Sequence, residues 1–114
     1  MTDEADKYRE IATSAIPEVQ KVRIYDETWN HVLTDHGEPG HLLPYFEQAV
    51  NSAIAKPTSV HQSTTDPQKG FLFVTTEHTR NGKPMAVAVR VVEGTSARMT
   101  SAVFRTKSSG TARR

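Results

Sequence analysis

Residues 71–93 carry the feature that most restricts the fold: two strand-like apolar runs joined by a short polar turn. The turn contains Asn81-Gly82, the residue pair that a tight β-hairpin prefers because both central positions need positive φ. In the second run the large apolar side chains stand at every second position: Met85, Val87, Val89 and Val91. This spacing predicts a strand with these side chains on its buried face. The segment is therefore predicted to form an antiparallel hairpin.

Further strand-like runs extend this hairpin into a meander. Strands are expected at residues 59–64, 71–79, 85–93 and 97–106, separated by turns rich in Gly, Pro, Asn and Asp. Ahead of them, residues 41–55 have apolar side chains at the helical period, and a shorter helix is expected from Trp29 to Gly37. The predicted fold class is α+β, with N-terminal helices packed on one face of a four-stranded antiparallel β-sheet meander.

The N-terminal part of the chain is more polar. Residues 1–18 are predicted to form a polar helix or arm, with the helix itself over residues 3–15. Residues 19–25 alternate apolar and charged side chains, which predicts a short edge strand. A single α+β domain is therefore expected over residues 19–106, followed by a disordered basic tail at residues 107–114.

The composition excludes several kinds of site. The chain has no cysteine, so disulfides, thiolate zinc sites and cysteine nucleophiles are excluded, and the reducing cytoplasm is the expected location. No apolar run approaches the roughly 18 residues that cross a bilayer, and the acidic, polar start argues against a secretory signal. No two histidines have the i, i+4 spacing of a helical zinc pair, so neither a metal site nor another cofactor is expected.

Charge is distributed unevenly along the chain. Residues 1–57 hold ten acidic and five basic side chains, whereas residues 58–114 hold three acidic and nine basic ones. Clustered Lys and Arg side chains favour nucleic acid, because their binding releases counterions from the phosphates. The same asymmetry would also suit a solvated strand face with a loose tail, so charge alone leaves both interpretations open.

Two histidines stand on the predicted helix that begins at Trp29. Read at the helical period, His36 falls on the same stripe as Trp29 at the point where Gly37 ends the helix. His31 points the opposite way, toward water. His36 is therefore expected at the edge of the core, where an imidazole that titrates near neutral pH is a candidate acid or base.

A second set of candidates is expected on the exposed face of the sheet. If the apolar residues of the last two strands face the helices, Arg90, Arg98 and Thr100 project from the opposite face. Two arginines and a hydroxyl on one open sheet face would suit a long anionic ligand.

Three segments, taken in order, resemble a known group of proteins. They are Trp29-Asn30-His31-Val32 with His36-Gly37-Glu38, then Ala55-Lys56-Pro57-Thr58-Ser59-Val60, and finally Met99-Thr100-Ser101-Ala102-Val103-Phe104. With the order of elements around them, they resemble phage-encoded members of the barnase, EndoU, colicin and RelE-like (BECR) ribonuclease superfamily. The match spans about residues 19–106.

The resemblance implies metal-independent cleavage of RNA by a toxin or phage effector. In such chemistry one group takes a proton from the 2′-hydroxyl, another protonates the departing 5′-oxygen, and cations stabilise the charged phosphorane. His36 is the leading acid–base candidate, with His31 and His78 as weaker ones. Arg90 would bind phosphate, and Thr100, at the family's late-strand position, would orient it.

Other basic residues are expected to hold the RNA strand: Arg98, Arg105, Lys107 and Lys83. The resemblance also implies an acidic antitoxin or inhibitor protein that covers the basic face. Two alternatives keep the fold without the cleavage. In one, the sheet face binds nucleic acid without cutting it, and in the other, the chain is a phage protein that binds a host protein through its acidic N-terminal part.

Overall fold

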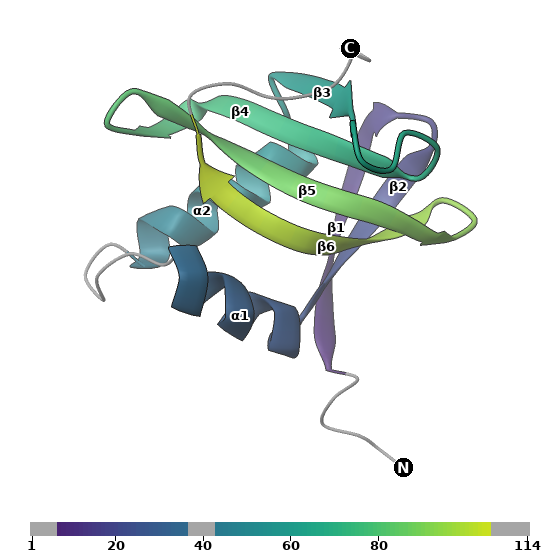
Figure 1. Ribbon diagram of the computed structural model, residues 1–114, viewed down its shortest axis with the longest axis horizontal. Helices are drawn as coiled ribbons and strands as arrows, with labels where there is room; N and C mark the ends of the chain where they lie inside the picture. Colours follow the sequence, from purple (N-terminus) through teal and green to yellow (C-terminus); the bar gives the residue numbers. More distant parts are fainter. Residues whose placement is uncertain (1–6, 37–42, 106–114) are drawn as a thin grey trace.

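The computed structural model describes residues 7–36 and 43–105 of the chain, and Figure 1 shows their arrangement. The elements follow in the order β1 (Tyr8–Ile16), β2 (Val19–Tyr25), α1 (Asp26–His36), α2 (Leu43–Ala55), β3 (Ser59–Gln62), β4 (Gly70–Arg80), β5 (Lys83–Glu93) and β6 (Ser96–Phe104). The six strands form one curled sheet in the order β1-β2-β6-β5-β4-β3. All neighbouring strands are antiparallel except β2 and β6, which are parallel.

One face of the sheet packs against the helices. In Figure 1, α2 lies behind β4 and β5, and α1 lies along the side of β6. The core between them contains fully buried side chains from α2, such as Phe46 and Val50, and from the strands, such as Phe73 and Val87. The opposite face of the sheet carries a smaller buried apolar cluster of Leu72, Val74 and Ala86. This second face is the one available for polar chemistry.

The hairpin predicted around Asn81-Gly82 is confirmed. Both residues have positive φ, 57° for Asn81 and 78° for Gly82, and the flanking Arg80 and Lys83 pair across the turn. The alternation along β5 is confirmed as well, since Met85, Val87 and Val89 are all buried in the main core. The strands β3 to β6 thus form the expected meander.

The predicted fold class is nevertheless wrong. The sheet has six strands rather than four and is mixed rather than antiparallel. The helix expected at residues 3–15 is replaced by strand β1 from Tyr8 onward, and residues 1–6 lie outside the described residues. β1 forms because β2 supplies a pairing partner through a two-residue turn, so the cross-strand bonds outweigh the weak helical pattern.

Strand β2 is correctly predicted as a strand but not as an edge. It lies between β1 and β6, and its apolar residues Val19, Val22 and Ile24 are buried. The boundary placed between an arm and a domain at residue 18 falls in the turn of the β1–β2 hairpin. The predicted tail at residues 107–114 lies outside the described residues. Neither described helix is long and apolar enough to cross a membrane.

A truncation in the core tests this packing. Phe73 of β4 is fully buried against the helix layer, so Phe73→Ala should lower the free energy of unfolding by about 3–5 kcal/mol, because it removes apolar contacts and leaves a cavity. Val92→Ala is the matched control at a side chain that is 44% exposed, with an expected change within about 0.5 kcal/mol. Urea unfolding followed by circular dichroism measures both, and equal losses would contradict the assigned core.

Candidate functional site

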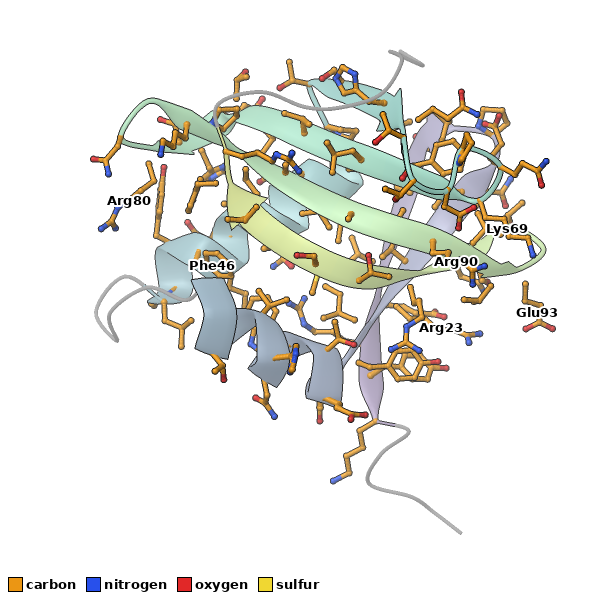
Figure 2. All side chains as sticks on the ribbon, viewed as in Figure 1. Arg23, Phe46, Lys69, Arg80, Arg90 and Glu93 are labelled. Carbon is orange, nitrogen blue, oxygen red and sulfur yellow. The ribbon has the colours of Figure 1, made fainter. Side chains whose placement is uncertain are left out.

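Three arginines lie in register across three neighbouring strands. Arg98 of β6 is the partner of Arg23 in the parallel pair with β2 and of Arg90 in the antiparallel pair with β5. Residues paired across strands project from the same face, and the neighbours of these arginines along each strand are buried in the core. The three guanidinium groups therefore lie on the face opposite the core. Figure 2 shows Arg23 and Arg90 at the same end of the sheet, with Arg80 at the other.

Carboxylates pair with the two outer arginines of this row. The Nε of Arg23 lies 3.3 Å from an oxygen of Glu10 on β1, and the Nε of Arg90 lies 2.7 Å from an oxygen of Asp66. Arg98, in the middle, has uncharged partners. Its Nη2 donates a hydrogen bond of 3.1 Å to the hydroxyl of Thr28, and its guanidinium lies 4.7 Å from the centre of the Tyr25 ring. Within residues 7–36 and 43–105, the central arginine of the row therefore has no ion pair with a carboxylate.

A pocket of about 300 Å³ opens beside Arg98 where helix α1 meets β6. Its lining consists of Glu27, Thr28, His31, Arg98 and Thr100. Glu27 and His31 are four residues apart, so they share one side of α1, and both are exposed. The opposite side of α1 carries Val32, which is buried in the core. The pocket therefore combines a carboxyl group and an imidazole from the helix with a guanidinium and a hydroxyl from the sheet.

Thr100 owes its position to an irregularity in β6. Ser101 pairs with Ala88 and Met99 pairs with Val89, so Thr100 is an extra residue between two ladder positions, as in a β-bulge. Its hydroxyl donates a hydrogen bond of 3.2 Å to the carbonyl oxygen of Ala88. Bulges of this kind often re-aim a side chain next to a binding site. Here the bulge places Thr100 in the lining of two separate pockets.

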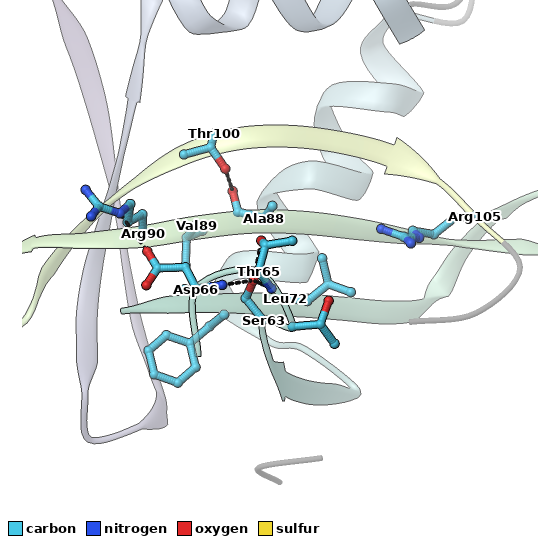
Figure 3. Close-up of a pocket in the computed structure, with 12 residues that line it drawn as sticks. Ser63, Thr65, Asp66, Leu72, Ala88, Val89, Arg90, Thr100 and Arg105 are labelled. Carbon is cyan, nitrogen blue, oxygen red and sulfur yellow. Dashed lines mark hydrogen bonds and ion pairs between the residues drawn. The ribbon is translucent and has the colours of Figure 1, made fainter. Parts of the chain in front are cut away.

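The second pocket, of about 350 Å³, lies between the β3–β4 loop and the open face of the sheet (Figure 3). Leu72 and Ala88 contribute apolar surface, and Arg90 and Arg105 line it from positions well apart along the strands. Hydroxyl groups of the loop residues 63–65 complete the lining. This arrangement suits a ligand with a flat or apolar body and a negative charge.

The loop beside this pocket is held by its own short-range bonds. The Ser63 hydroxyl accepts hydrogen bonds of 3.2 Å from the backbone N–H groups of Thr65 and Asp66. Gly70 lies directly beneath the loop, and a Cβ atom there would come within 2.8 Å of Ser63 Cβ and 2.9 Å of the Asp66 carbonyl oxygen. The close approach explains why this position is a glycine. It brings the Asp66 carboxylate to Arg90.

The Asp66 carboxyl group is electrostatically perturbed. Its hydrogen bond from Arg90 holds its pKa below the usual aspartate value, because the ionised form is the better acceptor. The ion pair is exposed, with 54% of the Arg90 side chain accessible to solvent. Exposed pairs contribute little to stability. A competing anion could therefore take the place of Asp66 at little cost.

The structure brings five of the predicted site residues into two neighbouring pockets. His31, Arg98 and Thr100 line the pocket beside α1, and Thr100, Arg90 and Arg105 line the pocket beneath the loop. His36 is the last residue of α1, and its side chain is outside the described part of the chain. Lys107 also falls outside the described residues.

His78 and Lys83 lie at the other end of the sheet. His78 stands near the β4–β5 turn, with its ring 5.5 Å from that of Tyr45, and Lys83 begins β5 at the same turn. Arg90 pairs with Gly70, at the opposite end of β4. Eight residues of extended strand separate Gly70 from His78, a span of about 26 Å. Neither His78 nor Lys83 therefore shares a pocket with the arginine row.

Three residues of the site were not predicted from the sequence. Glu27 could have been found, since it lies one helical turn before His31. Arg23 could not, because its role depends on the parallel pairing of β2 with β6. Asp66 was read only as part of a turn. Its contact with Arg90 depends on how the loop folds back over Gly70.

The chain matches no protein-family model, no curated protein and no solved structure. Any function assigned to it rests on its own residues.

The perturbed carboxyl group gives a direct test of the site. In Arg90→Gln the pKa of Asp66 should rise toward the ordinary aspartate value, because the charged donor is lost. In the unchanged protein the pair's contribution to stability is present above that value. It is lost as the pH falls through the lowered pKa. An NMR titration of the side-chain carboxyl carbons measures the shift.

Arg23→Gln is the matched control for this titration. It removes another arginine of the same row that has no contact with Asp66, so the carboxyl pKa should stay low. A pKa for Asp66 that is already ordinary in the unchanged protein would contradict the described ion pair.

Proposed function

We propose that this chain is a small RNA-cleaving domain that acts without a metal ion, with its reacting centre between α1 and β6. One observation supports the proposal above the others. Glu27 and His31, two groups able to exchange protons, line one pocket with Arg98, which forms no ion pair with a carboxylate among the described residues. Cleavage at a ribose 2′-hydroxyl requires a proton acceptor, a proton donor and a cation that stabilises the phosphorane, and these three groups could supply them. The activity is the one implied by the resemblance to the BECR ribonucleases.

The proposed reaction is a transfer within the RNA strand. The Glu27 carboxylate accepts the proton of the 2′-hydroxyl, and the 2′-oxygen attacks the adjacent phosphorus. The bond from phosphorus to the 5′-oxygen breaks, and the His31 imidazolium gives that oxygen its proton. The products are a 2′,3′-cyclic phosphate and a free 5′-hydroxyl, so every proton and bond is accounted for. Arg98 stabilises the additional negative charge on the phosphorane, and the Thr100 hydroxyl contacts a phosphate oxygen.

This assignment moves the acid–base role from His36 to His31. The pocket that holds Arg98 and Thr100 meets the first half of α1, whereas His36 ends the helix. The two histidines are five positions apart in the helix, which corresponds to a rise of about 7.5 Å along its axis. The reason for preferring His31 is its shared pocket with Arg98.

The test is cleavage of single-stranded RNA in the presence of EDTA. The unchanged protein should produce 2′,3′-cyclic ends, and His31→Gln should lower kcat by about 10²- to 10⁴-fold, the usual contribution of a positioned acid or base. His61→Gln is the matched control on strand β3, where the imidazole contacts Ser59 instead of the pocket, and it should retain activity. Full activity in His31→Gln, or loss of activity in His36→Gln alone, would contradict the assignment.

A second function, RNA binding without cleavage, is favoured by the arginine row itself. The three aligned guanidinium groups would contact phosphates whether or not the pocket is catalytic. In the toxin interpretation, an acidic antitoxin or inhibitor would cover the same row, because its carboxylates would compete with the RNA phosphates.

Salt dependence measures this binding separately from cleavage. Arg98→Gln should reduce the slope of log affinity against log salt by about one unit, since each lost phosphate contact releases one counterion fewer. Lys56→Gln, at the end of α2 and away from the row, should leave the slope unchanged. A 2′-O-methyl RNA strand lacks the nucleophile and keeps cleavage out of the measurement. Equal slopes for the two variants would contradict a role of the row in RNA binding.

A further inference from the structure

An exposed tyrosine stands at the outer end of the arginine row. Tyr8 begins strand β1 and is 45% exposed, which with Val92 makes it one of two large apolar side chains so exposed in the described part of the chain. It pairs with Tyr25 across the β1–β2 ladder, and the two rings lie 5.0 Å apart at an angle of 38°. Tyr8 is thus held in place by strand β1 and by the Tyr25 ring, and nearly half of its surface remains exposed to solvent.

Each of the two rings also lies beside an arginine. The Arg23 guanidinium lies 5.1 Å from the centre of the Tyr8 ring, and the Arg98 guanidinium lies 4.7 Å from the centre of the Tyr25 ring. Arg23 also donates a hydrogen bond of 3.4 Å to the Tyr25 hydroxyl. Tyr8, Arg23 and Tyr25 thus contact one another, and this column of side chains continues from Tyr25 to Arg98. That column ends at the pocket in which Arg98 lies.

Aromatic rings that lie beside cations are suited to unpaired nucleotides. A base stacks on the ring face, and its phosphate meets the guanidinium beside it. Tyr8 lies at the end of a strand and is exposed enough for a base to reach it. The bases of an A-form duplex are stacked on one another and cannot reach such a ring.

We propose that Tyr8, Arg23 and Tyr25 form a subsite for one unpaired nucleotide of a single-stranded RNA, next to the phosphate that Arg98 binds. The base stacks on Tyr8 and its phosphate binds Arg23. The subsite deepens the proposed function, on which it rests for the identity of the ligand, by restricting the substrate to single strands.

Glu10 sets the strength of this subsite. Its carboxylate lies 3.3 Å from the Nε of Arg23, on the neighbouring strand, and so occupies the charge that a phosphate would use. An incoming phosphate must compete with Glu10. Removal of this carboxylate should therefore strengthen RNA binding, which is the opposite of what a general loss of structure would do.

The experiment measures binding of a 2′-O-methyl RNA single strand and of the matched duplex by fluorescence anisotropy. Tyr8→Leu should weaken binding of the single strand by about 5- to 150-fold, the range for loss of one stacked base, and should change duplex binding little. Tyr8→Phe keeps the ring and should keep the affinity. Glu10→Gln should tighten single-strand binding, and circular dichroism shows whether each variant is folded.

A kinetic measurement separates the subsite from the reacting centre. With a cleavable strand, Tyr8→Leu should raise KM and leave kcat unchanged, because Tyr8 contacts a nucleotide beyond the scissile bond. If the unchanged protein binds single strands through Tyr8 but cuts none, the cleavage proposal fails and the subsite stands. Equal binding by Tyr8→Leu and the unchanged protein, equal affinity for duplex and single strand, or no binding of either would overturn the subsite.

Discussion

The β1–β2 hairpin joins the β3–β6 meander through a seam of three parallel residue pairs, in which residues 21–23 of β2 lie beside residues 96–98 of β6. A further backbone bond of 2.9 Å runs from the N–H of Gln20 to the carbonyl oxygen of Thr95. A two-stranded hairpin is marginally stable in water, and β1 and β2 are stabilised by this seam together with their packing on α2 and α1. The seam also ends early. Beyond Arg98, strand β6 contacts helix α1, and there the pocket beside Thr100 opens.

The same seam creates an electrostatic cost. Like charges directly opposite each other on a sheet are destabilising, yet the register places Arg98 beside both Arg23 and Arg90. Glu10 and Asp66 offset the outer charges, and the Tyr25 ring lies against the central one. These three aligned charges therefore stabilise the fold no more than neutral side chains at the same positions would. In the proposed function, the alignment serves to bind the phosphates of an RNA strand.

The elements that sequence analysis could predict are those determined locally. The Asn81-Gly82 turn, the alternation of β5 and the apolar period of α2 each lie within a short window, and each agrees with the structure. Strand β1 could not be predicted, because the spacing of Tyr8, Ile11 and Ala12 also fits the apolar stripe of a helix. Its conformation is decided by pairing with β2. The parallel seam joins residues about 75 positions apart, and no local sequence pattern predicts this pairing.

The site residues, too, could be predicted only where their positions are determined locally. Alternation sufficed to place Arg90 and Arg98 on the open face, because period two is a property of one strand at a time. Which histidine meets them could not be read in this way. The answer depends on where β6 leaves β2, and on the bulge that turns Thr100 toward α1. Those are relations between elements, and they select His31 for the pocket.

Helix α1 links the stability of the fold to the proposed chemistry. Val32 is buried in the core, and Trp29 packs on Phe46 with ring centres 5.7 Å apart. On its other side, Thr28 binds Arg98 and His31 lines the pocket. Because one rigid helix carries both sets, the contacts that anchor it in the core also fix the position of His31 relative to β6. A proton donor must be held close to its target, so the packing of Trp29 and Val32 is part of the proposed active site.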